Sequence, residues 1–167
     1  MILRYVKDSG GGSVILTEKV IETLKQYRQK KIFEKEAGGQ LFAQFDGADT
    51  YIVDATPPNP SDKRGRFSFR PDRNIQQIDI ARRYTMGLHF AGDWHTHPQP
   101  IPSPSSIDIA SMIECFNKSK HGLKAFLIVI VGVAEPPLGI YVGLVRNNTI
   151  EKMNLDTIHP PLTSARW

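Results

Sequence analysis

The sequence of 167 residues contains a single cysteine, Cys115. One thiol cannot form a disulfide within the chain, and a zinc finger built from several cysteines is excluded as well. The longest apolar run, residues 125–134, is too short to cross a bilayer, which needs about 20 residues. The stretch MILRYVKDSGGG lacks the apolar core of a signal peptide. These absences predict a soluble, cytoplasmic protein that has no membrane partner.

No class of residue dominates what is present. The chain is 40% hydrophobic and 23% charged, which is ordinary for a globular protein. Its length predicts one domain over residues 1–167, with a core at about 12–155. The net charge of +4 comes largely from Lys and Arg residues between Lys63 and Arg83. This basic segment is either a solvated face or a docking surface for an acidic partner; nucleic acid is not expected, because no RNA- or DNA-reading motif accompanies it.

Three segments have the residue spacing of helices: 17–30, 72–85 and 105–118. Thr17, Asp72 and Ser105 are plausible N-caps. Gln29 falls on the expected polar face of the first helix. The expected inward positions are Val20, Ile21, Leu24 and Tyr27 in the first helix and Ile75, Ile78 and Ala81 in the second.

The other apolar segments have the properties of β-strands. They are 14–16, 36–45, 50–55, 67–70, 88–96, 125–133, 139–145 and 149–153. Asp46-Gly47 and Asn147-Asn148 indicate hairpin turns. Residues 56–66 are expected to form a polar loop, and the tail with Pro160 and Pro161 an irregular segment. The pattern predicts a mixed α/β chain with about three helices.

Two histidines stand one residue apart in the stretch GDWHTHPQPIPSPSSID, residues 92–108. Residues i and i+2 of a strand point to the same face, so His95 and His97 can both reach one metal ion. Asp108 can add a carboxylate oxygen if the proline-rich loop folds back. Two imidazoles and one carboxylate leave a zinc position open for water, which is the pattern of a catalytic site.

Hydrolysis at such a site needs a general base beside the water. Glu36 and Glu34 are both candidates, and their positions alone do not separate them. Gly38 and Gly39 leave room for close approach of a metal centre or a substrate strand. Ser105 and Asp108 also have a structural explanation as a capping box, which is compatible with a role in the site.

The segments EAGGQLF (36–42) and HTHPQPIPSPSSID (95–108) together resemble the JAMM motif of the JAB/MPN metalloproteases. The shared pattern is E-x-G-G, then H-x-H-P, then S-x-x-D. The resemblance in element order covers roughly residues 12–150. It implies an MPN-type (cytidine-deaminase-like) α/β fold with a curved mixed sheet flanked by about three helices.

The same resemblance implies the roles of the motif residues. One zinc ion per chain would be held by His95, His97 and Asp108. Glu36 would be the base that deprotonates water, and Ser105 would help to stabilise the oxyanion. All five motif positions match, which is typical of an active enzyme of the family.

Within the family, the GDWHTHP run and the segment FSFRPDR (67–73) resemble stand-alone bacterial members, including deconjugating enzymes of CBASS antiphage operons. This implies an isopeptidase that cuts after the C-terminal glycine of a ubiquitin-like protein. A cGAS-like nucleotidyltransferase and an E1/E2-like conjugating enzyme are the implied partners. Two alternatives are release of a small sulfur-carrier adduct and a binding role in DNA metabolism.

Trp94, Phe42 and Phe69 are candidates for the border of the groove, although core packing is the simpler interpretation for each. Cys115 follows Asp108 by seven residues in the expected third helix. It lies about 10 Å further along that helix, too far to share the metal. We therefore expect Cys115 to be a core residue.

Overall fold

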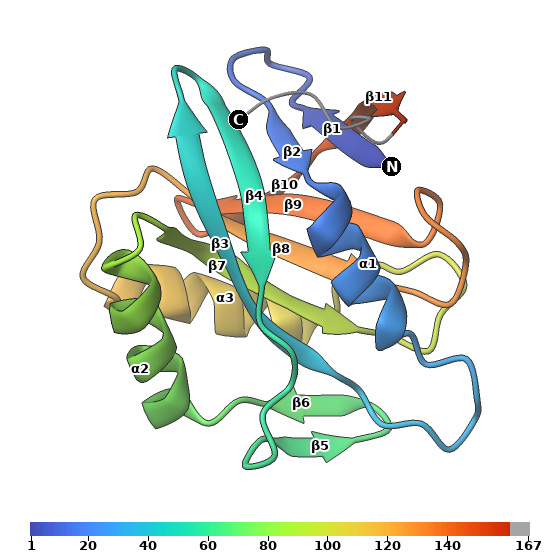
Figure 1. Cartoon of the computed structure of the whole chain (residues 1–167). Coiled ribbons are helices and arrows are strands. Elements are labelled where there is room, and N and C mark those ends of the chain that lie inside the picture. The colour runs from blue at the N-terminus through green and yellow to red at the C-terminus, as the bar shows by residue number, and fades with distance from the viewer. Residues whose placement is uncertain (161–167) are drawn as a thin grey trace.

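The structure is a computed structural model that describes residues 1–160. Most strands form one curved mixed sheet (Figure 1). Its order is β10 (Thr149–Lys152), β9 (Ile140–Arg146), β8 (Phe126–Val131), β7 (His89–Thr96), β3 (Gly38–Asp46), β4 (Asp49–Ala55), β2 (Val14–Leu16), β1 (Ile2–Val6) and β11 (Asn154–His159). A separate hairpin pairs β5 (Lys63–Gly65) with β6 (Ser68–Arg70). The helices are α1 (Glu18–Gln26), α2 (Arg73–Tyr84) and α3 (Ser106–Lys118). The predicted mixed α/β class is confirmed.

The large sheet curls strongly. β10 and β11 stand at opposite ends of the strand order, yet only Met153 separates them in the chain. The backbone N–H of Met153 donates to the carbonyl of Val142 at 2.9 Å, and the Met153 side chain is buried. The two edges of the sheet therefore lie beside each other.

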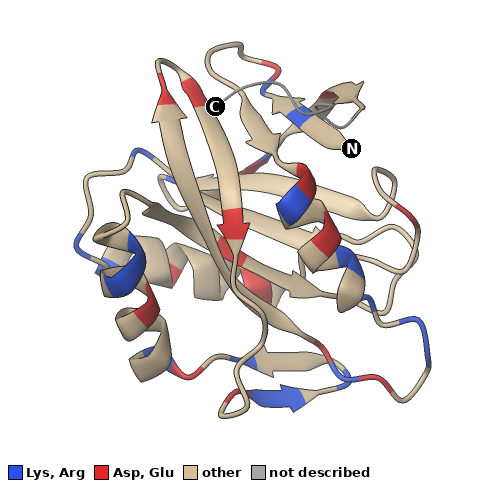
Figure 2. Ribbon diagram, in the orientation of Figure 1, with Lys and Arg blue, Asp and Glu red and all other residues tan. Residues whose placement is uncertain are grey.

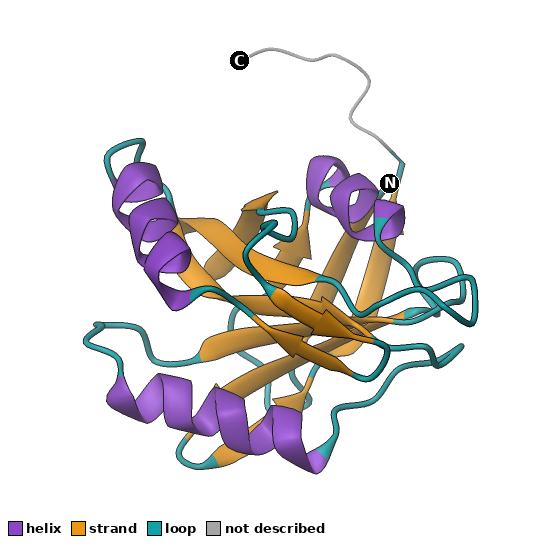
Figure 3. Ribbon diagram, turned by 90° about the horizontal axis from the view of Figure 1, so that it is seen from below, coloured by secondary structure: helices purple, strands orange, loops and turns teal. Residues whose placement is uncertain are grey.

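Helices cover both faces of the sheet. Figure 3 shows α1 and α2 on one side of the strands and α3 on the other. The central strand β8 is consequently buried on both faces, which explains its unbroken apolar sequence. Alternate β8 residues enter two clusters: Leu127, Val129 and Val131 pack in the cluster that includes α1, and Phe126, Ile128 and Ile130 pack with Met112 of α3.

The expected helix over 17–30 is too long, because α1 ends at Gln26. Thr17 is the N-cap residue, but its side chain makes no capping hydrogen bond. Gln29 lies beyond the helix and is only 3% exposed, so its placement on a solvated polar face was wrong. The periodic pattern continues past the helix, but the chain leaves the helical path and turns Gln29 inward.

The inward face of α2 was predicted only in part: Ile75 is half-buried, but Ala81 is exposed. Asp72 caps the helix as expected, accepting from the backbone N–H groups of Asn74 and Ile75. Ile78, however, is 62% exposed, and the buried residue of the helix is Gln76. Gln76 accepts from Arg73 of the same helix, and Arg83 pairs with Asp54 of β4, so hydrophobicity did not identify this side of the helix.

Three strands were not predicted: β1, β5 and β11. The segment 154–159, expected to be irregular, forms β11 and pairs with β1, from Ile2 opposite His159 to Val6 opposite Asn154. β5 forms inside the expected polar loop 56–66. β1 and β11 are far apart in the chain, so local periodicity does not reveal their pairing, whereas β5 joins its partner β6 through a two-residue turn. Pro161 lies outside the described residues.

Two other local predictions are confirmed. Ser105 caps α3 through a capping box with Asp108. Asn147 and Asn148 turn the β9–β10 hairpin with φ angles of 49° and 59°.

No helix within residues 1–160 has the length and apolar character needed to cross a membrane.

The basic segment does not lie on one element. Figure 2 shows Lys and Arg on β5 and at both ends of α2. Three of these cations have hydrogen-bond partners inside the molecule: Arg64 donates to the backbone carbonyl of Glu36, Arg73 donates to Gln76, and Arg83 pairs with Asp54 and Asp79. Part of the positive charge thus serves the fold itself.

Candidate metal centre

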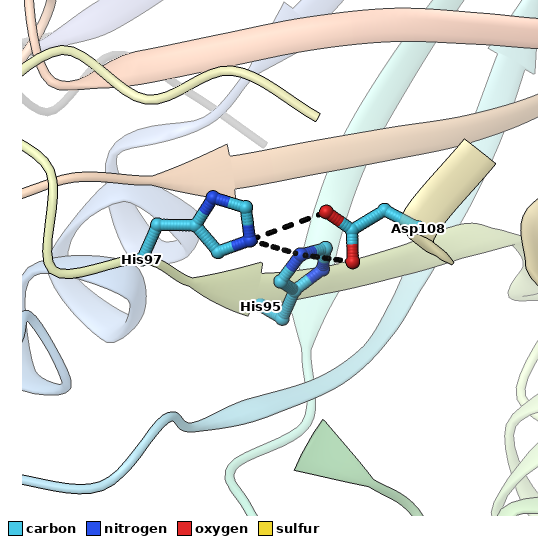
Figure 4. Close-up of side chains that lie close together, drawn as sticks. All are labelled: His95, His97 and Asp108. Carbon is cyan, nitrogen blue, oxygen red and sulfur yellow. Dashed lines mark hydrogen bonds and ion pairs between the residues drawn. The ribbon is translucent and has the colours of Figure 1, made fainter. Parts of the chain in front are cut away.

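His95, His97 and Asp108 converge as the sequence predicts (Figure 4). The Nε2 atoms of the two imidazoles lie 3.1 Å apart. The Asp108 carboxylate reaches both rings, with Oδ1 at 3.3 Å from His95 Nε2 and Oδ2 at 3.2 Å from His97 Nε2. His95 lies on β7, and His97 follows the strand directly with its N–H bonded to the carbonyl of Val131 at 2.9 Å.

The first turn of α3 positions Asp108. Asp108 Oδ2 accepts from the backbone N–H of Ser105 at 2.7 Å, and Ser105 Oγ accepts from the backbone N–H of Asp108 at 3.1 Å. The proline-rich loop returns over the end of β8, where the carbonyls of Gln99 and Pro100 accept from Val133 and Ala134. These bonds bring a residue eleven positions beyond His97 back to the histidine pair.

The three donors fit a small divalent ion. Two nitrogens at about 2.0–2.1 Å from a tetrahedral zinc are about 3.3 Å apart, close to the 3.1–3.3 Å separations between the three side chains. Imidazole nitrogen and carboxylate oxygen are both usual zinc donors. The donor set therefore matches a zinc ion held by three protein ligands.

Electrostatics favours an ionised carboxylate at this centre. Burial alone would raise the pKa of Asp108, but hydrogen bonds from His95, His97 and the Ser105 backbone outweigh burial and hold that pKa far below its usual range. Burial alone would lower the pKa of His97, yet its bond to Asp108 leaves that pKa raised. The Asp108 carboxylate is thus ionised, as a metal ligand must be.

Glu36 lines the same groove and is 6% exposed. Burial raises its pKa to about 7, with His97 lowering the pKa and Asp108 raising it further. The rival Glu34 does not line the groove; its carboxylate accepts from the backbone N–H of Lys31 at 2.9 Å. The geometry therefore separates two carboxylates that sequence position alone did not.

The groove at the centre has a volume of about 720 Å³. Its floor is β7, and its walls are α3 on one side and β6 with the start of α2 on the other. Ser105, Ile107, Ser111, Met112 and Cys115 line the first wall, and Phe67, Phe69, Arg70, Arg73 and Gln76 line the second.

Asp93 on the groove floor was missed by the sequence analysis. Among the described residues, none donates a hydrogen bond to its buried Oδ1. Burial raises its pKa to about 6, and Arg73 partly opposes that rise. The sequence spacing could have identified Asp93. It lies two residues before His95 and four before His97, so the three side chains point to the same face of the strand.

The chain itself occupies the space beside Gly38 and Gly39. A Cβ on Gly38 would lie 2.6 Å from the Phe69 ring, and one on Gly39 would lie 2.1 Å from the Thr56 carbonyl oxygen. These glycines thus admit neighbouring segments of the same chain, and the expected open surface for a substrate strand is covered here.

The remaining candidates divide between core and groove. Phe42 is fully buried and does not line the groove, Trp94 is fully buried yet lies among the groove-lining residues, and Phe69 is half-buried and borders the groove. Cys115 is half-buried and packs against the cluster that contains Met112 and Phe126. It also lines the groove, and burial raises the pKa of its thiol.

Fold and site together define a mixed α/β protein in which a His-His-Asp group that could hold a metal ion lies beside a buried glutamate. The family model described as prokaryotic homologs of the JAB domain matches residues 18–142. The chain belongs to this family of prokaryotic JAB-domain homologs, as the motif resemblance implies.

Similar proteins carry related names. The chain is 29% identical to a CD-NTase/cGAS isopeptidase of Escherichia coli over 90% of its own length and 93% of that protein. It is 34% identical to a protein of the same name from Pseudomonas aeruginosa, over 70% of this chain and 75% of the relative. The solved structure of protein DSY2949 from Desulfitobacterium hafniense matches with a TM-score of 0.60 at 23% identity, covering 82% of this chain and 87% of that one, and supports the fold.

Proposed function

We propose that this protein is a zinc-dependent isopeptidase that cleaves after the C-terminal glycine of a ubiquitin-like protein or its conjugate. The observation that carries the proposal is the convergence of His95, His97 and Asp108 in one groove with the buried carboxylate of Glu36. This arrangement supplies three metal ligands and a base from four separate positions in the chain.

His95, His97 and Asp108 would hold the zinc ion. When bound, zinc supplies Lewis-acid chemistry, activating water as a nucleophile and polarising the scissile carbonyl. Glu36 accepts the proton of the attacking water and passes it to the departing amine. A base with a pKa near neutrality is suited to both transfers, and burial raises the pKa of Glu36 to about 7.

Ser105 would donate a hydrogen bond to the carbonyl oxygen as negative charge develops on it. Its Oγ accepts from the Asp108 backbone N–H, which leaves the hydroxyl hydrogen free to donate. Ser105 is exposed and lines the groove. A substrate tail extended between α3 and β6 would bring its carbonyl within reach.

The names of the relatives support the substrate class. Proteins 29% and 34% identical to this chain are named CD-NTase/cGAS isopeptidases. We infer that the chain acts on conjugates of a cGAS-like nucleotidyltransferase in a CBASS-type antiphage pathway. An E1/E2-like conjugating enzyme would be the second partner in that pathway.

The Glu36→Gln variant tests the proposal. It keeps the size and hydrogen-bonding capacity of the side chain but removes the base, so we expect it to retain about one zinc per chain and to lose activity by about 10²–10⁴-fold. The probes are a CD-NTase and a ubiquitin-like protein, each extended at its C-terminus by a reporter protein, and the measurements are cleavage rate and zinc content.

The control is His95→Ala, which should lose both metal and activity. If His95→Ala kept its zinc and its rate, the ligand assignment would be wrong. If the wild type cleaved an adduct of a small sulfur-carrier protein and neither reporter fusion, the substrate class would be wrong.

A further inference from the structure

We propose that Gln29 is a positioning residue that holds the catalytic base, Glu36, at a fixed position relative to the metal-binding histidines. The inference rests on the proposed function, because it gives Gln29 a purpose only if Glu36 acts as the base. It concerns a buried side chain that follows α1 and lies outside the groove lining.

The amide of Gln29 has a partner on each side. Its Oε1 accepts from the Thr96 hydroxyl at 3.0 Å, and its Nε2 donates to the carbonyls of Glu34 at 3.1 Å and Arg66 at 3.0 Å. Both N–H groups and the carbonyl are thus engaged, and the side chain is 3% exposed. A buried amide with every bond made specifies one arrangement of the segments it joins.

Thr96 connects Gln29 to the residue next to the base. It lies between the two histidine ligands and is fully buried. Its Oγ1 accepts from the backbone N–H of Ala37 at 2.9 Å, and its own backbone N–H donates to the Ala37 carbonyl at 2.8 Å. The strand that carries the ligands is therefore tied directly to the segment that carries Glu36.

The other two partners of Gln29 reach Glu36 from the opposite direction. Glu34 precedes it by two residues, and Arg66 follows Gly65, whose carbonyl accepts from the Glu36 N–H at 2.7 Å. One side chain thus joins three segments: the chain before the base, the β5–β6 hairpin that binds its backbone, and the ligand strand. Misplacing a catalytic group by about 1 Å can lower a rate by about 10²-fold, so these links bear on catalysis.

Amide hydrogen exchange measured by NMR on metal-free, ¹⁵N-labelled protein tests the links without substrate. The variants are Gln29→Met, which keeps the approximate shape but removes the amide, and Thr96→Val, which removes the hydroxyl. The matched control is Thr56→Val. Thr56 is also buried, and its Oγ1 accepts from the backbone N–H of Gln40 at 2.8 Å; Gln40 lies on β3, the strand that begins just after Ala37.

We expect Gln29→Met to speed exchange of the Glu36 amide, and Thr96→Val that of the Ala37 amide, each by about tenfold, as for one lost hydrogen bond. Thr56→Val should affect the Gln40 amide and leave those of Glu36 and Ala37 unchanged. In cleavage of the CD-NTase fusion, both site variants should lower kcat by about 10–100-fold with KM and zinc content unchanged. Thr56→Val should keep the wild-type kcat.

Unchanged exchange at Glu36 in Gln29→Met would overturn the inference. An equal loss of kcat in Thr56→Val would do the same, because the effect would then be general destabilisation. If Gln29→Met fails to fold, the Thr96→Val variant tests the inference instead. A wild-type kcat in Thr96→Val would then show that its link to the Glu36 segment does not affect catalysis. If the wild-type protein cleaves no probe, the proposed function fails while the exchange data still show whether Gln29 holds Glu36.

Discussion

At the scale of single residues, the centre combines groups whose environments move their pKa values in opposite directions. Burial raises the pKa of Glu36 to about 7, while hydrogen bonds from two imidazoles hold that of Asp108 low despite its burial. Groups with separated pKa values can take separate roles as proton acceptor and metal ligand. The two carboxylates are therefore not interchangeable.

Ser105 has a structural and a proposed catalytic role, which substitution can separate. Ser105→Ala removes the cap of α3, so we expect a loss of about 0.5–2 kcal/mol of stability, and it also removes the oxyanion donor, which should lower kcat by about 10²–10³-fold. Thermal unfolding and cleavage kinetics measure the two effects.

The matched control for Ser105→Ala is Asp72→Ala, which removes the cap of α2. It should cost a similar amount of stability but leave kcat near the wild-type value. Equal loss of activity in both variants would remove the argument for Ser105 as a donor to the oxyanion.

At the scale of elements, Asp54 joins a strand to two helices. Its carboxylate on β4 pairs with Lys19 of α1 at 2.7 Å and with Arg83 of α2 at 2.8 Å. Burial alone would raise the pKa of Asp54, but the bonds from Lys19 and Arg83 lower it overall. A helix with a polar inner face is thus attached to the sheet through charge.

This attachment predicts a dependence of stability on pH. Because the pKa of Asp54 is lower in the folded state, its contribution is fully present above the unfolded pKa of about 3.9 and fades as pH falls below it. We expect Asp54→Asn to unfold more readily than wild type at pH 7 and the difference to shrink towards pH 2. Denaturant titrations at several pH values measure it; a constant difference would contradict the assignment.

At the scale of the whole molecule, a bound metal would connect the sheet to a helix that packs on it. His95 lies on β7 and Asp108 on α3, so an ion held by both crosslinks the two layers in the folded state alone. A ligand that binds only the folded state stabilises it by about 2.7 kcal/mol at a hundred times its Kd.

Zinc should therefore raise the unfolding temperature of metal-free protein, with chelator reversing the rise. In His95→Ala the rise should be absent, and in Glu36→Gln it should persist. Scanning calorimetry with and without zinc measures it, and an equal rise in His95→Ala would place the ion elsewhere.

The sequence by itself determined the donor set and the elements that carry it. His95 and His97 share a face because a strand alternates, and Ser105 with Asp108 opens α3 because a capping box is a local pattern. The mixed α/β class followed from periodicity in the same way. All of these features depend on residues close together in the chain.

Tertiary structure alone decided the rest. Gln29 is buried because Glu34, Arg66 and Thr96 meet around it, and Gly38 is covered because Phe69 packs over it. β1 and β11 pair across almost the full length of the chain. Arg83 of α2 is held against the sheet because Asp54 of β4 lies opposite it. Each feature depends on partners distant in sequence, and local residue patterns carry no record of which distant segments will meet.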